Sequence, residues 1–168
     1  MKADPAPVPK ILVLASGSGT NLQALIDATR ERDFPGEIIA VGCNKPGAFA
    51  LERAAQANLT TFVVDHTKYG SREEFDAALL AEILRHNPDL VVLAGFMRIL
   101  TSDFVRAFRG RMLNIHPSLL PAYTGLNTHQ RVLEAGDRTH GVSIHFVTEE
   151  LDGGPVIAQA EVAVAEDD

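Results

Sequence analysis

An amide and an imidazole stand two residues apart at Asn114 and His116, directly before Pro117. The apolar residues around them predict a strand over residues 111–116, so both side chains should lie on one face. Because Pro117 ends this strand, His116 should lie near the carboxyl end, where open α/β sheets bind ligands. An amide N–H can donate to a developing oxyanion, and an imidazole can supply or accept a proton. The alternative is a histidine packed at a strand end and bonded to a loop.

Asp152 is a third candidate, although its Asp-Gly-Gly sequence is also typical of a simple turn. A carboxylate beside His116 would favour the protonated imidazolium, but spacing along the chain does not show whether the two residues meet. His116, His129 and Asp152 could also form a metal site of two histidines and one carboxylate. Nothing in their spacing favours such a site, and we expect no metal. His145 and Ser143 share a face of another predicted strand and belong either to the site or to the core.

Glycines and hydroxyl side chains follow the first predicted strand, in the sequence Ser-Gly-Ser-Gly-Thr-Asn over residues 16–21. Glycine allows the backbone to approach a ligand closely, and the N-terminus of the helix expected next favours an anion. A dinucleotide site is disfavoured, because Leu22 replaces the third glycine of its turn and no acid follows the second strand. A single phosphate monoester fits best, and the alternative is a tight turn that binds nothing.

Alternating apolar and helical segments should position these residues in the first half of the chain. Four short apolar runs predict parallel strands covered on both faces, over residues 11–15, 38–42, 60–64 and 90–94. Helical patterns separate them, over residues 21–32, 48–57 and 71–86. Ser71 and Glu74 form a capping box at the start of the last helix. This order predicts an open α/β sheet with helices on both faces.

The second half is less regular and predicts a mixed sheet. The patterns indicate a helix over residues 127–135 and strands over residues 111–116, 141–148 and 155–164. The last two strands are joined by a short turn, so we expect them to be antiparallel. Residues 165–168 are typical of the acidic first turn of a helix, and no helix follows. We therefore expect residues 1–9 to form a flexible tail and residues 10–168 to form a single domain that lacks C-terminal elements.

Composition and charge exclude several classes of protein. With 168 residues, of which 46% are hydrophobic and 22% charged, the chain is expected to be globular rather than disordered. The net charge of −7 disfavours a nucleic-acid or anionic-membrane surface, and we expect neither partner. The single cysteine, Cys43, fits a reducing compartment, and we expect a cytoplasmic protein. The N-terminal residues have no apolar stretch that would indicate a signal peptide.

The same stretches together resemble the glycinamide ribonucleotide (phosphoribosylglycinamide) formyltransferase family of de novo purine synthesis. The resemblance runs from Ile11 to about Val164 and rests on an ordered set of motifs: SGSGTNLQ at 16–23, LERA at 51–54, SREEFD at 71–76, DLVVLAGFMRIL at 89–100, LNIHPSLLPAYTG at 113–125, HGVSIHFV at 140–147 and ELDGGPVI at 150–157. It implies a Rossmann-like formyltransferase fold. It also implies transfer of a formyl group from 10-formyltetrahydrofolate, as co-substrate, to the amine of glycinamide ribonucleotide.

The resemblance also implies roles for particular residues. Asn114, His116 and Asp152 would be catalytic, and Gly19, Thr20 and Asn21 would bind the substrate phosphate. The folate would contact a larger set: Arg72, Met97, Arg98, Ile99, Leu100, Asn114, Thr148, Glu149, Glu150, Leu151 and Asp152. The chain departs from the family at Thr124, where proline is usual, and at Asn127, where histidine is usual.

Two other classes of function remain open from the sequence. The chain could use 10-formyltetrahydrofolate with another acceptor or with water, or it could be an inactive fragment that binds folate or phosphate. A homodimer is one open oligomeric state.

Overall fold

The computed structural model describes residues 7–168, which form two compact units with the boundary between Ile99 and Leu100. Of the predicted tail, residues 1–6 lie outside the described residues, and residues 7–9 are exposed and irregular. The first unit contains the predicted glycine-rich turn, and the second contains the predicted catalytic residues.

Four parallel strands form the centre of the first unit. They are β1 (Lys10–Ala15), β2 (Glu37–Cys43), β3 (Thr61–Val63) and β4 (Leu90–Leu93), in the order β3-β2-β1-β4. Leu12, Val13 and Leu14 in β1 are fully buried, because helices cover both faces of this part of the sheet. All four predicted strands are therefore confirmed, with small differences at their ends.

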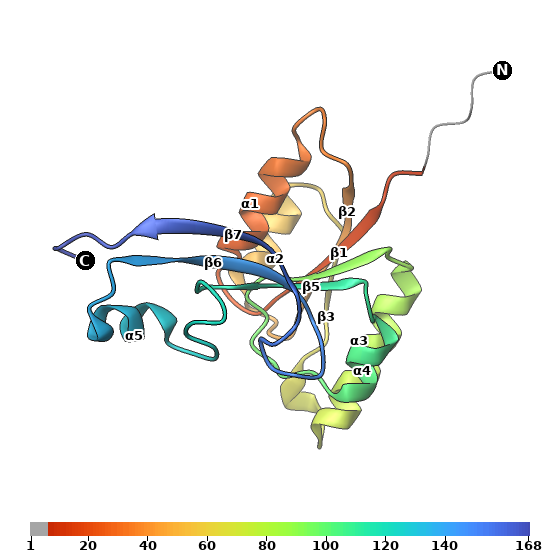
Figure 1. Ribbon diagram of the computed structural model, residues 1–168. Coiled ribbons are helices and arrows are strands. Elements are labelled where there is room, and N and C mark those ends of the chain that lie inside the picture. The colour runs from red at the N-terminus through yellow and green to blue at the C-terminus, as the bar shows by residue number, and fades with distance from the viewer. Residues whose placement is uncertain (1–6) are drawn as a thin grey trace. The chain divides into compact units, whose positions relative to one another are not determined.

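Three helices cover these strands: α1 (Thr20–Thr29), α2 (Phe49–Gln56) and α3 (Arg72–His86). Figure 1 shows α1 and α2 together on one side of the strands and α3 on the other. The predicted cap of α3 is present, since the Ser71 hydroxyl accepts from the Glu74 N–H at 3.2 Å. A 3₁₀ helix, η1 (His66–Lys68), was not predicted. Helix α1 ends three residues early, because its last N–H groups bond to carbonyls only three residues back.

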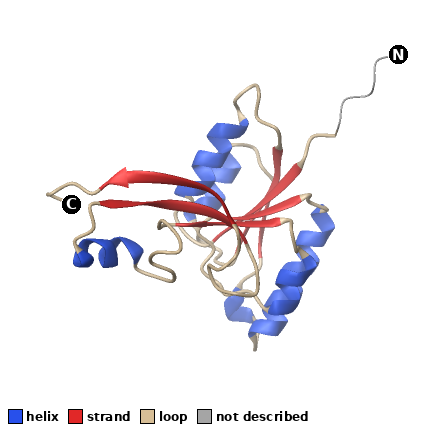
Figure 2. Ribbon diagram, in the orientation of Figure 1, coloured by secondary structure: helices blue, strands red, loops and turns tan. Residues whose placement is uncertain are grey.

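The second unit combines helices with antiparallel strands. Its elements are α4 (Ser102–Ala107), β5 (Met112–His116), α5 (Thr128–Ala135), β6 (Thr139–Phe146) and β7 (Val156–Ala163). Strand β6 pairs with β5 and with β7 in antiparallel register, which confirms the predicted mixed sheet. Figure 2 shows β6 and β7 as a long two-stranded ribbon. Helix α4 was not predicted; it has only six residues and is capped by the Thr101 hydroxyl.

The predicted α/β class is confirmed by both units, with parallel strands in the first and antiparallel strands in the second. None of the helices within residues 7–168 has the length and apolar character needed to cross a membrane.

Candidate functional site

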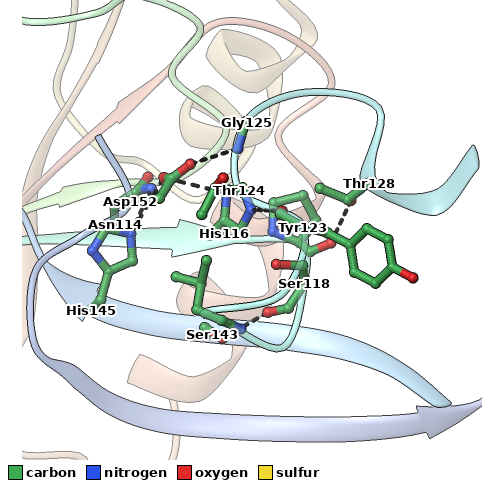
Figure 3. Close-up of polar contacts among 12 residues, drawn as sticks. Asn114, His116, Ser118, Tyr123, Thr124, Gly125, Thr128, Ser143, His145 and Asp152 are labelled. Carbon is green, nitrogen blue, oxygen red and sulfur yellow. Dashed lines mark hydrogen bonds and ion pairs between the residues drawn. The ribbon is translucent and has the colours of Figure 1, made fainter. Parts of the chain in front are cut away.

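Asn114, His116 and Asp152 meet in the second unit. Both Asn114 and His116 lie on β5, and the side chains of His116 and Asp152 are each 6% exposed. The Nδ1 atom of His116 lies 3.5 Å from Oδ1 of Asp152, which is an ion-pair distance when the ring is protonated. Figure 3 shows the two side chains facing one another, with Asn114 beside Asp152. The structure thus brings together three side chains whose proximity the spacing along the sequence could not show.

The other ring nitrogen of His116 contacts the backbone. Its Nε2 atom lies 2.8 Å from the carbonyl oxygen of Tyr123, which can only accept, so Nε2 carries a hydrogen. Both ring nitrogens of His116 therefore face acceptors that belong to the protein. A bound ligand can receive a hydrogen bond from this ring only by replacing the Tyr123 carbonyl or by sharing the N–H that faces Asp152.

Asp152 is fixed by a loop that the sequence did not connect to it. Its Oδ2 atom accepts from the backbone N–H of Gly125 at 2.9 Å. Asp152 and Tyr123 both have left-handed backbone conformations, with φ of 52° and 54°. Such angles are uncommon for residues other than glycine and cluster at functional sites. Arg131 of α5 secures the same loop by donating to the Thr124 carbonyl at 2.6 Å.

The two candidates on β6 have different surroundings. The hydroxyl of Ser143 donates to the Ser118 carbonyl at 2.7 Å and accepts from the Leu120 N–H at 3.0 Å, so it supports the loop after His116. His145 instead contacts Asn114, with 3.1 Å between the Asn114 amide nitrogen and Nε2 of His145. His145 therefore lies among the predicted catalytic residues, whereas Ser143 contacts the backbone of the loop that follows His116.

His129, the third residue of the candidate metal set, pairs with another histidine. Its Nδ1 atom lies 2.7 Å from Nε2 of His140, and the two rings meet edge to face. The short distance requires one nitrogen to donate and the other to accept, so the pair cannot be protonated on both facing atoms. Within residues 7–168, no group of three or more His, Cys, Asp or Glu side chains is arranged to hold a metal ion.

We expect the histidine pair to make stability depend on pH. Burial and the neighbouring His129 lower the pKa of His140, so the unfolded chain binds a proton more readily than the folded one. Stability should therefore fall as pH decreases below the unfolded value of about 6.5. Thermal unfolding at pH 7.5 and 5.5 measures this, and the fall should be smaller in His140→Leu. An equal fall in both proteins would contradict the assignment.

The glycine-rich turn of the first unit borders a cavity of about 330 Å³. It is lined mainly by the turn and the start of α1, with one lysine and three residues that follow β4: Ser16, Gly17, Ser18, Gly19, Thr20, Asn21, Lys45, Ala94, Gly95 and Met97. No side chain among the described residues forms a hydrogen-bonded cap on α1, so backbone N–H groups of its first turn remain unbonded within the helix. Lys45 was not predicted to belong to this site, although it follows β2, a strand that is adjacent to β1.

Hydrogen bonds hold this turn in one shape. The Ser16 hydroxyl donates to Asn44 at 2.6 Å and accepts from the Met97 N–H at 2.8 Å. The Arg53 side chain donates to the Ser18 carbonyl at 2.7 Å. Gly19 has φ of 73°, and a Cβ there would lie 2.8 Å from the backbone of Ala50. The turn therefore requires glycine at this position on two independent grounds.

The folate-binding residues predicted in the first unit surround its last segment. Met97 and Ile99 are exposed, at 67% and 61%, and Arg72 is exposed at the start of α3. The Arg98 guanidinium lies over the Phe75 ring, and its buried Nε has no hydrogen-bond partner among the described residues. Two large apolar side chains are thus accessible to a ligand, whereas Arg98 packs against α3.

The folate-binding residues predicted in the second unit are Leu100 and the loop 148–152, together with Asn114. Thr148 and Glu149 line an apolar cavity of about 350 Å³, together with Val105, Arg109, Gly110, Phe146, Val147 and Pro155. The Glu149 carboxylate pairs with Arg106 at 3.1 Å and Arg109 at 3.5 Å. Glu150 and Leu151 are exposed and do not line this cavity. The apolar wall was not predicted, because its residues come from α4 and from the end of β6.

The second unit thus contains a buried imidazole, a carboxylate that faces it and an amide beside the carboxylate. These groups can stabilise an oxygen that becomes negative and can hold a proton close to it. The first unit offers backbone N–H groups and a lysine, which suit an anion.

Comparison with known proteins places the chain in a family. Residues 9–168 match the family described as formyl transferase. The phosphoribosylglycinamide formyltransferase of Escherichia coli is 56% identical over 154 residues, which are 92% of this chain and 73% of that protein. The trifunctional purine biosynthetic protein adenosine-3 of Gallus gallus is 49% identical over 92% of this chain and 16% of its own length.

Solved structures agree with this placement over nearly the whole chain. The glycinamide ribonucleotide transformylase 1 of Symbiobacterium toebii has a TM-score of 0.92 and 46% identity, over 96% of this chain and 76% of its own. The phosphoribosylglycinamide formyltransferase of Coxiella burnetii has a TM-score of 0.90 and 49% identity, with the same coverage. The chain therefore belongs to the formyl transferase family, among the phosphoribosylglycinamide formyltransferases.

Proposed function

We propose that this protein transfers a formyl group from 10-formyltetrahydrofolate to the primary amine of glycinamide ribonucleotide. The observation that carries the proposal is the pair of buried side chains His116 and Asp152, with half-buried Asn114 beside Asp152, in a chain that belongs to a formyltransferase family. The side chains of His116 and Asp152 are each 6% exposed, and a charged pair that is buried in this way is typical of functional sites.

A mechanism follows from the chemistry of these side chains. The substrate amine attacks the formyl carbon, and the carbonyl oxygen becomes negative. The Asn114 amide and protonated His116 donate to that oxygen, while Asp152 stabilises the positive charge on the ring. The bond between the formyl carbon and the folate nitrogen then breaks. One amine proton leaves, and one proton reaches the folate nitrogen, through water.

The glycine-rich turn is proposed to bind the substrate phosphate through Gly19, Thr20 and Asn21. The start of α1, which has no side-chain cap, and Lys45, which lines the same cavity, support this assignment. Backbone N–H groups at a helix N-terminus and a nearby cation together favour an anion.

The apolar cavity beside Thr148 and Glu149 supports a flat, partly polar donor such as a pterin. Val105 and Val147 supply apolar walls, and Glu149 and Arg109 supply polar groups at the same cavity. This composition is typical of small-molecule sites, which are mostly apolar with a few placed polar groups.

A labelled-formyl assay tests the proposed function and separates it from its alternatives. With 10-formyltetrahydrofolate as donor, label should appear on glycinamide ribonucleotide far faster than on glycinamide, which lacks the ribose phosphate. Label found only as formate would indicate a hydrolase. Donor binding without release of label in any form would indicate a binding module, and both outcomes would contradict the proposal.

Substitution at Gly19 should weaken the phosphate site. In Gly19→Ala, the left-handed conformation costs about 1–2 kcal/mol, and the new methyl group overlaps Ala50. We expect a lower melting temperature and a KM for the phosphorylated acceptor raised about tenfold, as for one lost charge-assisted hydrogen bond. The KM for the formyl donor should change little.

Gly17→Ala is the matched control for stability, because no heavy atom lies within 4 Å of a Cβ built at Gly17. Its melting temperature should equal that of the unmodified protein. Equal melting temperatures for the two variants would contradict the close packing of Gly19.

A further inference from the structure

His145 has a contact pattern that specifies how its ring is protonated. The side chain is 3% exposed on β6, in register with Asn114 of β5. Its Nδ1 atom lies 2.9 Å from the Phe146 carbonyl oxygen. Its Nε2 atom lies 3.1 Å from the Asn114 amide nitrogen and 3.8 Å from Oδ1 of Asp152. Figure 3 shows the ring beside Asn114 and Asp152.

The hydrogen-bond partners of this ring specify one tautomer. The Phe146 carbonyl can only accept, so Nδ1 carries a hydrogen. The nearer neighbour of Nε2 is an amide N–H group, which can only donate, so Nε2 presents a lone pair. His145 is therefore a neutral imidazole with its hydrogen on Nδ1. The Asn114 amide uses one N–H for His145 and retains the second.

A doubly protonated His145 would disrupt this arrangement in two ways. Its Nε2–H would oppose the amide N–H of Asn114 and force that amide to rotate. It would also compete with His116 for the same oxygen of Asp152, since the two ring nitrogens lie 3.8 Å and 3.5 Å from Oδ1. The neutral ring avoids both conflicts and leaves the carboxylate to His116.

We propose that neutral His145 is a positioning residue that fixes the Asn114 amide by accepting one of its N–H groups, so that the second N–H can donate to the oxygen that becomes negative. This inference rests on the proposed function. In the proposed mechanism, His145 does not contact the reacting atoms and acts only through Asn114. Its effect should therefore fall on kcat rather than on the KM of either substrate.

Two polar substitutions separate this role from a structural one. The side-chain amide of His145→Gln reaches the position of Nε2 and keeps an acceptor for Asn114. The shorter His145→Asn keeps only the group near Nδ1 that contacts Phe146. We expect kcat of the Gln variant within about threefold of the unmodified value, and kcat of the Asn and Leu variants reduced about tenfold, as for one lost hydrogen bond. If Asn retains more activity than Gln, the contact with Phe146 is what matters and the proposal is wrong.

Coupling to Asn114 gives a second test. In an Asn114→Ala background, His145→Leu should reduce kcat no further, because the amide that it positions is gone. The same tenfold loss in both backgrounds would contradict a role through Asn114.

An NMR measurement keeps the inference testable if the unmodified protein transfers no formyl group, an outcome that would reject the proposed function alone. In ¹⁵N-asparagine-labelled protein, the Asn114 side-chain signals are identified by their loss in Asn114→Ala. One of the two amide protons should shift in His145→Leu and keep its position in His145→Gln. Identical Asn114 signals in all three proteins would overturn the inference.

Discussion

Replacing His116 with alanine should lower kcat by a factor of about 10²–10³ or more, with a much smaller change in the KM of either substrate. Removal of one oxyanion donor typically costs this much, and the same ring also holds a proton beside Asp152. The loss acts on the transition state, because the formyl oxygen becomes a strong acceptor only when the amine attacks. Steady-state kinetics with both substrates varied measures the effect.

The effect must be separated from a loss of folded protein. Truncation of the buried ring leaves a small cavity, so the melting temperature of His116→Ala should fall. The kinetic measurements should therefore be made well below that temperature. His86→Ala is a matched control, since His86 is half-buried and stacks on Phe62 in the first unit. Its kcat should be unchanged, and unchanged turnover in His116→Ala would reject the catalytic role of His116.

Replacing Asp152 with asparagine should lower kcat about 10²-fold, at the lower end of what general acid–base groups contribute. The substitution keeps the shape and an oxygen that can accept from Gly125, but it removes the charge that faces His116. The imidazolium then loses its stabilising partner, so the ring donates less effectively to the developing oxyanion. The KM values should change little.

The control for Asp152 is an aspartate whose charge faces solvent. Asp103 is 92% exposed in α4 and pairs with Arg106, an arrangement that contributes little to stability. Asp103→Asn should therefore retain full activity. If Asp152→Asn also retains full activity, the charge of Asp152 has no part in the reaction.

The pattern of apolar residues along the chain predicted most of the fold, because this pattern is clear in the strands and helices of the first unit. Buried parallel strands appear as continuous apolar runs, and the run at residues 11–15 became β1 with only Lys10 added. The Ser71 cap began α3 where the sequence placed it. Helix α4 was missed because six residues carry too little periodicity, although Thr101 followed by Asp103 was an available signal for a helix start.

The spacing of residues along the chain identified candidate site residues, but it could not predict which of them meet in space. Asn114 and His116 lie on one strand, so their proximity follows from the period of two. Asp152 lies in a turn, and its approach to His116 depends on a left-handed backbone and on the loop that contributes Gly125. The carbonyl of Tyr123 carries no side-chain signal at all, so no sequence pattern could identify it as a partner of His116.

The role of His145 likewise depends on contacts between strands that the sequence does not specify. The alternating pattern predicts that His145 and Ser143 share one strand face, but it does not distinguish a place in the site from a place in the core. Only the register of β5 against β6 sets His145 opposite Asn114, and only the hydrogen-bond partners distinguish it from Ser143. Antiparallel register is decided by the turn and by the packing of the whole sheet rather than by either strand alone.

A double-mutant cycle between His116 and Asp152 provides the decisive measurement, with kcat for formyl transfer as the readout. If the imidazole and the carboxylate work as a single unit, the variant that carries both His116→Ala and Asp152→Asn should be no slower than His116→Ala by itself. If instead the two losses multiply, to a combined deficit of about 10⁴–10⁵, the side chains act separately and their joint role is refuted.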